Sequence, residues 1–330
     1  MVRRVSAVLF SRTRRAGPSA LIALVLACVL TACAPALAPR GMASETPAIQ
    51  DDAFVTADGL RLPLRHWDAT PPQAVIVALH GMSDYSEAFD LPGPWWAAHG
   101  ITVYAYDQRG FGRGPNPGLW AGARIMRADL ADFVEAVRAK HPGVPVYALG
   151  ESMGGAVLLS ALASARPPRI DGAILAAPAV WSREDMPVSY NVALWLGAHT
   201  IPWKRLSGEG LKIWPSDNVP MLRKLSHDPL YQHEARIDQV YGLVDLMDEA
   251  RAAPSRLTAN PPILFLYGAR DQVIPREPTE EVVTELSGRA TAIRYPRGYH
   301  MLLRDLEGEK VWNDILAWIA KTNKSAGQRP

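Results

Sequence analysis

Two kinds of hydrophobic pattern alternate along the chain. Nearly continuous apolar runs, typical of strands buried on both faces of a sheet, occupy residues 75–79, 101–106 and 144–149. Further strands are expected at residues 173–176, 263–267 and 291–295, and helices at residues 95–99, 126–140, 279–286 and 311–321. Strands that alternate with helices predict an α/β fold with a doubly wound, mostly parallel sheet of about eight strands.

Two segments depart from this alternation. Residues 54–62 alternate between apolar and polar positions around an Asp-Gly turn, which predicts a β-hairpin. Residues 181–257 contain helical patches at 188–196 and 236–252 but no run that resembles a buried strand. We therefore expect one domain over residues 53–330, with an all-helical insertion that forms a cap over the carboxyl ends of the strands.

The first 32 residues have the pattern of a secretory signal. Five arginines and no acidic residue precede an apolar run at residues 20–30, and small residues then lead to Cys33. A single membrane-spanning anchor is the alternative, but the run is shorter than the about 20 residues that a spanning helix needs. Leu30-Thr31-Ala32-Cys33 resembles the bacterial lipobox, in which the cysteine thiol receives a diacylglyceryl group and cleavage occurs just before it.

This resemblance predicts where the mature chain begins and how it is attached. Residues 1–32 are expected to be a lipoprotein signal peptide, Cys33 a lipidated N-terminus, and residues 33–52, rich in Ala and Pro, a flexible tether. The protein would be a bacterial membrane lipoprotein that faces the periplasm. Ala34, rather than Asp, after the cysteine favours the outer membrane over the inner one.

Charge and cysteine content change this picture only slightly. The formal net charge is +2, but without the five arginines of the signal 30 basic residues face 33 acidic ones, a net of −3. No basic stripe remains, so nucleic acid is excluded as a partner. Cys28 and Cys33 are the only cysteines, so the mature chain would hold neither a free thiol nor a disulfide.

A candidate nucleophile lies where the run at residues 144–149 ends and a helix begins. Gly150-Glu151-Ser152-Met153-Gly154 has the Gly-x-Ser-x-Gly pattern of a sharp strand-to-helix turn, which exposes the serine hydroxyl above the sheet. The alternative is a glycine-rich structural turn whose serine has no chemical role. A serine hydroxyl is a weak nucleophile, so the first interpretation requires a base and a group that orients it.

His300 and Asp271 are the candidates for those two roles. His300 follows the last predicted strand, and Asp271 follows the strand at residues 263–267, whereas the other seven histidines lie in the hairpin, beside helix ends, after an early strand or in the insertion. A structural loop histidine and a turn-capping aspartate are the alternatives. The order Ser152, Asp271, His300, each after a strand, is nevertheless the order of the α/β-hydrolase triad.

Acyl transfer also requires donors for a developing oxyanion. The backbone N–H of Met153, directly after the serine, is one candidate, and that of Met82, after His80-Gly81 at the end of an early strand, is the other. A purely structural turn in which His80 orders the loop is a compatible alternative.

Taken together, these motifs resemble the monoacylglycerol lipase and lysophospholipase group of α/β hydrolases, which is similar to serine aminopeptidase S33. The resemblance covers residue 54 to the final helix and rests on His80-Gly81-Met82, Asp107-Gln108-Arg109-Gly110-Phe111-Gly112, Gly150-Glu151-Ser152-Met153-Gly154-Gly155, Gly268-Ala269-Arg270-Asp271 and Gly298-Tyr299-His300. It implies a carboxylic ester hydrolase that cleaves esters of single-chain lipids through an acyl-enzyme, without a metal or an organic cofactor. The early loop, Gly81-Met82-Ser83-Asp84-Tyr85-Ser86, departs from the Gly-Glu-His continuation of the animal lipases, which leaves substrate detail open.

The insertion and the fold leave alternatives open. The insertion contains four tryptophans, Trp181, Trp195, Trp203 and Trp214. They are expected either to form an apolar entrance or a face that contacts membrane, or to pack the cap onto the core. The same fold also hosts other esterases, thioesterases, peptidases and cofactor-free haloperoxidases. A catalytically silent lipoprotein that binds acyl ligands is a further alternative, although such a protein would not need all three triad residues.

Overall fold

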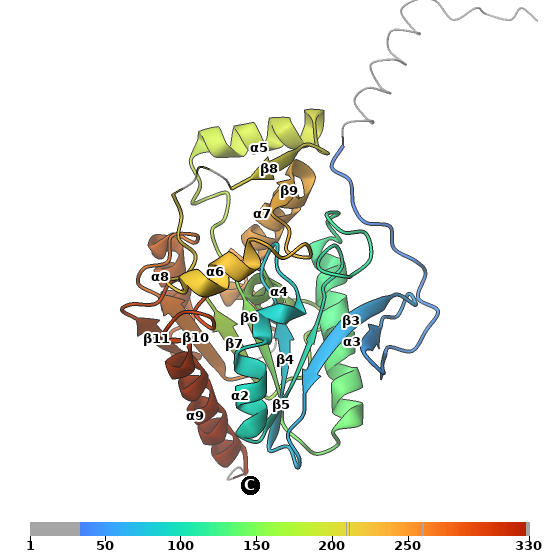
Figure 1. Ribbon diagram of the computed structural model, residues 1–330, viewed down its shortest axis with the longest axis vertical. Coiled ribbons are helices and arrows are strands. Elements are labelled where there is room, and N and C mark those ends of the chain that lie inside the picture. The colour runs from blue at the N-terminus through green and yellow to red at the C-terminus, as the bar shows by residue number, and fades with distance from the viewer. Residues whose placement is uncertain (1–33, 209, 211, 259–260, 328–330) are drawn as a thin grey trace, which may run out of the picture.

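The computed structural model describes residues 34–208, 210, 212–258 and 261–327 and shows an α/β-hydrolase fold (Figure 1). Within these residues a nine-stranded sheet has the order β1-β2-β3-β5-β4-β6-β7-β10-β11. The strands are β1 (Ala48–Gln50), β2 (Ala53–Val55), β3 (Arg61–Trp67), β4 (Ala74–Leu79), β5 (Ile101–Tyr106), β6 (Val146–Glu151), β7 (Gly172–Ala176), β10 (Ile263–Gly268) and β11 (Ala290–Tyr295). β1, β2 and β3 pair in antiparallel fashion, and all strands from β5 to β11 along the sheet run parallel. The six strands predicted from apolar runs and the N-terminal hairpin are thereby confirmed.

Helices cover both faces of the sheet, as a doubly wound fold requires (Figure 1). The described helices outside the insertion are α2 (Pro92–Ala98), α3 (Ala123–Lys140), α4 (Met153–Leu162), α8 (Arg276–Glu285) and α9 (Gly308–Gly327). Short 3-10 turns lie at η1 (Ser86–Phe89) and, at the end of the insertion, at η2 (Pro254–Arg256). Alternate residues of β4 enter two separate cores: Val75 and Val77 pack with α3 and α4, whereas Ile76 packs with α2 and α9. Because both faces of β4 are buried, its sequence is a continuous apolar run.

The insertion differs from the all-helical expectation. It contains helices α5 (Val188–Thr200), α6 (Val219–Leu225) and α7 (Ile237–Arg251), but also a two-stranded antiparallel sheet of β8 (Arg205–Ser207) and β9 (Glu234–Arg236). Each of these strands has three residues and little burial, so it leaves no hydrophobic run in the sequence. In Figure 1, α5, β8 and α6 lie beyond the end of the sheet at which β6 leads into α4.

The segment expected to be a flexible tether is folded against the domain over most of its described length. Ala38 is buried and donates from its N–H to the carbonyl of Trp120 (2.8 Å), and Leu37 forms a β-bridge with the same residue. Farther along, β1 pairs with β2. We call residues 34–50 the N-terminal strap. The expected signal peptide and Cys33 lie outside the described residues, and no described helix is long and apolar enough to cross a membrane.

Candidate active site

Ser152 occupies a strained turn between β6 and α4. Its φ of 52° and ψ of −115° lie outside the regions that L-residues normally adopt, a conformation that is held only when the surrounding structure imposes it. The turn is fixed by backbone hydrogen bonds from Ser152 N–H to the carbonyl of Ala176 (3.0 Å) and from Ala179 N–H to the carbonyl of Ser152 (2.9 Å). The serine is therefore presented at the end of the sheet by a rigid support.

The glycines on either side of Ser152 are required by close backbone contacts. A Cβ atom on Gly150 would lie 2.3 Å from the carbonyl oxygen of Gly154, and one on Gly154 would lie 2.2 Å from that of Leu79. Both separations are far shorter than any real contact, so only glycine allows β6, α4 and β4 to approach this closely.

The structure brings the three candidate triad residues into one hydrogen-bonded chain. His300 Nε2 lies 2.9 Å from Ser152 Oγ, and His300 Nδ1 lies 2.8 Å from Asp271 Oδ2. The other carboxylate oxygen of Asp271 accepts hydrogen bonds from the backbone N–H groups of Val273 (2.8 Å) and Ile274 (3.0 Å). Asp271 is thus fixed by its own loop and can hold the imidazole with Nδ1 protonated and Nε2 free to accept the serine proton.

The loops that carry Asp271 and His300 are held together at their bases. Arg270 N–H donates to the carbonyl of Gly298 (2.9 Å), and a Cβ atom on Gly268 would lie 2.4 Å from the carbonyl oxygens of both Gly298 and Tyr299. The spacing between the acid and the base is therefore set by direct backbone contact between the loops after β10 and β11.

The pKa of His300 is raised above the ordinary histidine value. Burial by itself lowers this pKa, but the negative charge of Asp271, the hydrogen bond to its carboxylate and the charge of Glu151 together raise it by more. These partners favour the imidazolium that forms when the histidine takes a proton from the serine.

The two candidate oxyanion donors lie beside Ser152. Met153 is the first residue of α4, where a backbone N–H has no partner within the helix. Met82 follows Gly81, whose Cβ atom, if it had one, would lie 3.2 Å from Ser152 Cβ. His80 is fully buried, and burial lowers its pKa. Its ring joins the carbonyl of Gly81 (2.8 Å) to the N–H of Gln108 (3.0 Å). His80 therefore orders the loop that carries Met82.

A buried ionic cluster beneath the site was not found from the sequence. Arg304 lies 2.5 Å from Asp84, in the loop after Met82, and 3.3 Å from Glu151, the residue before Ser152. All three are almost fully buried, and burial raises the pKa of Glu151 despite the charge of Arg304. The cluster ties the loop after His300 to the oxyanion loop and to the serine turn. The position of Glu151 inside the glycine-rich motif is the only sequence signal that pointed to it.

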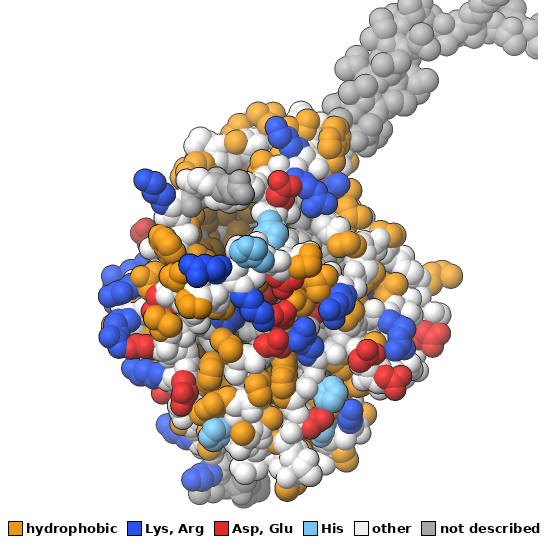
Figure 2. Space-filling view, in the orientation of Figure 1, with side chains coloured by type: hydrophobic (Ala, Val, Ile, Leu, Met, Phe, Trp, Pro, Cys, Tyr) orange, Lys and Arg blue, Asp and Glu red, His pale blue; other side chains and the backbone are white. Residues whose placement is uncertain are grey.

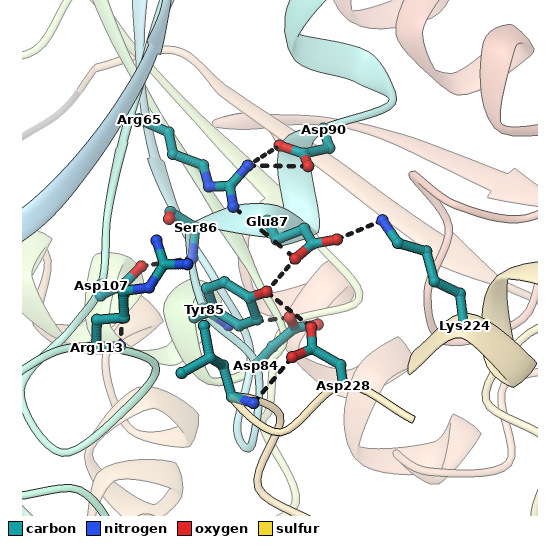
Figure 3. Close-up of polar contacts among 11 residues, drawn as sticks. Arg65, Asp84, Tyr85, Ser86, Glu87, Asp90, Asp107, Arg113, Lys224 and Asp228 are labelled. Atoms are coloured by element: carbon teal, nitrogen blue, oxygen red, sulfur yellow. Dashed lines mark hydrogen bonds and ion pairs between the residues drawn. The ribbon is translucent and has the colours of Figure 1, made fainter. Parts of the chain in front are cut away.

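A second polar network joins the cap to the oxyanion loop (Figure 3). The Tyr85 hydroxyl lies between Glu87 and Asp228, 2.7 Å from the latter, and Lys224 of α6 pairs with Glu87. Nearby, Gln232 N–H donates to the carbonyl of Ser83 (2.8 Å). The cap is thus anchored within a few residues of Met82, and a cleft of about 320 Å³ lies between η1 and α6.

The four cap tryptophans differ in how far they are buried. Trp181 is partly buried against the main core, so it packs the cap onto the domain. Trp195, Trp203 and Trp214 are 52%, 54% and 53% exposed. About half of each of these three side chains is therefore open to solvent. Met82, Met153, Ser152, Asp271 and His300 all lie in the described part of the chain, whereas Cys33 does not.

Comparison with known proteins gives the family. The family model described as serine aminopeptidase, S33 (Hydrolase_4) matches residues 70–307, and the chain belongs to this family. It is 29% identical over 285 residues to the monoacylglycerol lipase of Mycolicibacterium smegmatis, covering 82% of this chain and 96% of that relative. Human monoglyceride lipase is 24% identical, covering 88% and 96%. The crystal structure of Paleococcus ferrophilus monoacylglycerol lipase superposes with a TM-score of 0.66 at 22% identity, covering 79% and 99%.

Proposed function

We propose that the protein is a serine hydrolase that cleaves carboxylic esters of single-chain lipids, of the monoacylglycerol or lysophospholipid type, through an acyl-enzyme. The observation that carries the proposal is the continuous chain of hydrogen bonds from Ser152 through His300 to Asp271, beside two backbone donors. Nucleophile, base, orienting carboxylate and oxyanion site are the complete set of groups for acyl transfer.

In the acylation step, Ser152 Oγ attacks the ester carbonyl carbon while its proton passes to His300 Nε2. The carbonyl oxygen gains the negative charge, which the N–H groups of Met82 and Met153 stabilise. The bond to the alcohol then breaks, the alcohol leaves with the proton from His300, and the acyl group remains on Ser152. Asp271 stays ionised and stabilises the imidazolium.

Deacylation repeats these steps with water as the nucleophile. His300 takes a proton from water as its oxygen attacks the acyl-enzyme, and the same two N–H groups hold the second oxyanion. Collapse of this intermediate returns the proton to Ser152 and releases the fatty acid.

Two observations support a lipid ester rather than a peptide as substrate. The two relatives compared above, which are covered over 96% of their length, carry lipase names. Figure 2 shows the surface hollowed between α5 and α6 with hydrophobic side chains around it, which suits an acyl chain.

The test compares wild type with Ser152→Ala on p-nitrophenyl esters of increasing acyl length, on monoacylglycerols and lysophospholipids, and on an aminoacyl p-nitroanilide. We expect ester turnover by wild type, at least about 10³-fold less by the variant, and little cleavage of the anilide. A wild type that is inert on all esters would favour the non-catalytic lipid-binding alternative, and faster cleavage of the anilide would favour a peptidase.

We also propose that the mature chain is held on a bacterial membrane, facing the periplasm, by a diacylglyceryl group on Cys33, with the outer membrane as the favoured location. The support is the lipobox-like sequence at the end of the apolar run. Growth with radioactive fatty acid should label wild type but not Cys33→Ala. Equal labelling of both would refute this attachment.

A further inference from the structure

We infer that the exposed face of the cap built by α5 and the loop that follows it is the surface by which the protein rests on a phospholipid bilayer, and that the N-terminal strap aligns this face with the membrane by placing the anchor beside it. The inference rests on the proposed attachment at Cys33 and says how the attached protein is oriented.

The α5 face is unusually apolar for a surface exposed to water. Helix α5 contains no Asp, Glu, Lys or Arg, and Ala198 is its only buried residue. Val188, Tyr190, Val192, Trp195 and Leu196 are between 49% and 77% exposed. Single exposed apolar residues are ordinary, but a contiguous group of large ones marks an interaction surface.

The apolar surface continues past the end of α5. Ile201, Trp203 and Leu206 are 39%, 54% and 48% exposed, and Lys204 and Arg205 between them are also exposed. Figure 2 shows hydrophobic side chains along the end of the molecule where α5 lies. Tryptophan and tyrosine together with lysine and arginine are the residues enriched where protein meets lipid headgroups, so the composition fits a bilayer better than a protein partner.

The N-terminal strap leads directly to this surface. Ala36 N–H donates to Asp238 Oδ2 (3.2 Å) at the start of α7. Asp238 in turn donates from its own N–H to the carbonyl of Pro202 (3.1 Å), which adjoins Trp203. Figure 1 shows the strap in blue, running along the side of the domain up to the level of the cap.

Chain length then limits where the anchor can lie. Cys33 is three residues before Ala36, a separation that spans at most about 11 Å even when fully extended. A free tether of about 20 residues would have a root-mean-square reach of about 25 Å and would let the domain turn in any direction. With the strap docked, the acyl chains enter the membrane beside Trp203, so the α5 face meets the same bilayer.

The test uses site-specific fluorescent labels on the full, lipidated chain in vesicles of phosphatidylethanolamine and phosphatidylglycerol with brominated acyl chains. Cys28 is in the segment to be removed and Cys33 is acylated, so a new cysteine is the only thiol available for labelling. Val192→Cys on α5 is compared with Lys321→Cys on α9, at the opposite end of the molecule (Figure 1). We expect at least about threefold stronger quenching at Val192, because an apolar face sits within the headgroup–acyl boundary. Equal quenching at the two positions, or none at Val192, would overturn the inference.

Two further variants separate the contribution of the strap from that of the apolar α5 face. A flexible Gly/Ser insertion between Ala34 and Pro35 should reduce quenching of the Val192 label, and unchanged quenching would overturn the role of the strap. Val188→Asp with Val192→Asp should slow hydrolysis of a lipid ester in vesicles about tenfold or more while leaving a soluble short-chain ester unaffected. Equal rates on the vesicle substrate for the variant and wild type would contradict the docking surface.

The mass of the N-terminal peptide reports acylation separately. An unacylated chain overturns the proposed attachment and with it this inference, whereas an acylated chain whose α5 label stays in water overturns the inference alone. Turnover of the soluble ester reports the proposed hydrolase activity independently of both.

Discussion

Replacing Arg304 with methionine tests whether the buried ionic cluster supports the site. Arg304 is 5% exposed, lies 2.5 Å from Asp84 and 3.3 Å from Glu151, and is the shared cation of both. Methionine fills much of the same volume but leaves two buried carboxylates without a positive partner. Removal of one partner from a buried pair costs about 3–5 kcal/mol of the free energy of unfolding, and we expect a loss in this range near neutral pH.

The loss should depend on pH with a defined sign. Burial already raises the pKa of Glu151 above its ordinary value with Arg304 present, and without Arg304 this pKa rises further. A carboxyl group with a raised pKa binds more protons in the folded state than in the unfolded state, so the stability it contributes decreases as pH rises through that interval. The deficit of Arg304→Met should therefore be smaller at about pH 5.5 than at about pH 8.

Urea unfolding followed by tryptophan fluorescence measures the effect, with Arg304→Met compared with wild type at both pH values. Adding Glu151→Gln and Asp84→Asn to the variant should recover stability, because it removes the uncompensated charges. A loss of less than about 1 kcal/mol, which is within the range of ordinary surface changes, would refute the reasoning. So would a loss that is the same at both pH values.

Three further predictions concern the site itself. Asp271→Asn should lower kcat by about 10⁴, because an amide favours the wrong tautomer of His300, and a loss below about tenfold in an ester assay would contradict the assigned role. Since the pKa of His300 is raised and the neutral form is the base, kcat/KM should fall with decreasing pH with a midpoint above the ordinary histidine pKa of 6.5, and a pH profile with a lower midpoint would be inconsistent with this. Gly154→Ala should fail to fold or lose several kcal/mol, because its Cβ would lie 2.2 Å from the carbonyl oxygen of Leu79, whereas Gly208→Ala, with no atom within 4 Å, should leave the thermal unfolding midpoint unchanged.

The sequence was sufficient to predict the candidate site because this fold brings the loops that follow its parallel strands together. Ser152, Asp271 and His300 each follow a parallel strand, and the carboxyl ends of parallel strands meet at one edge of the sheet. The type of each residue and its position directly after a predicted strand were therefore enough to identify the three triad candidates. The hydrogen-bond geometry in the structure adds the orientation of each group.

The features missed from the sequence have no hydrophobic period to reveal them. The strap is held mainly through its own backbone N–H groups, which are the same in every residue and bond to carbonyls and to the side chain of Asp238. Strands β8 and β9 are too short and exposed to leave a pattern. Arg304 reads as an ordinary charged residue, since its partners Asp84 and Glu151 are brought to it only by tertiary folding.

The pairing of β1 with β2 has a practical consequence for producing the domain without its lipid. A truncated chain that started at residue 53, where the apolar pattern begins, would lose β1 and leave the backbone donors and acceptors along β2 open to solvent. Unpaired sheet edges recruit strands from other molecules, so such a chain should aggregate at high concentration. A secreted version that starts at Ala34 keeps that edge covered and is the better choice for crystallisation and for enzymology.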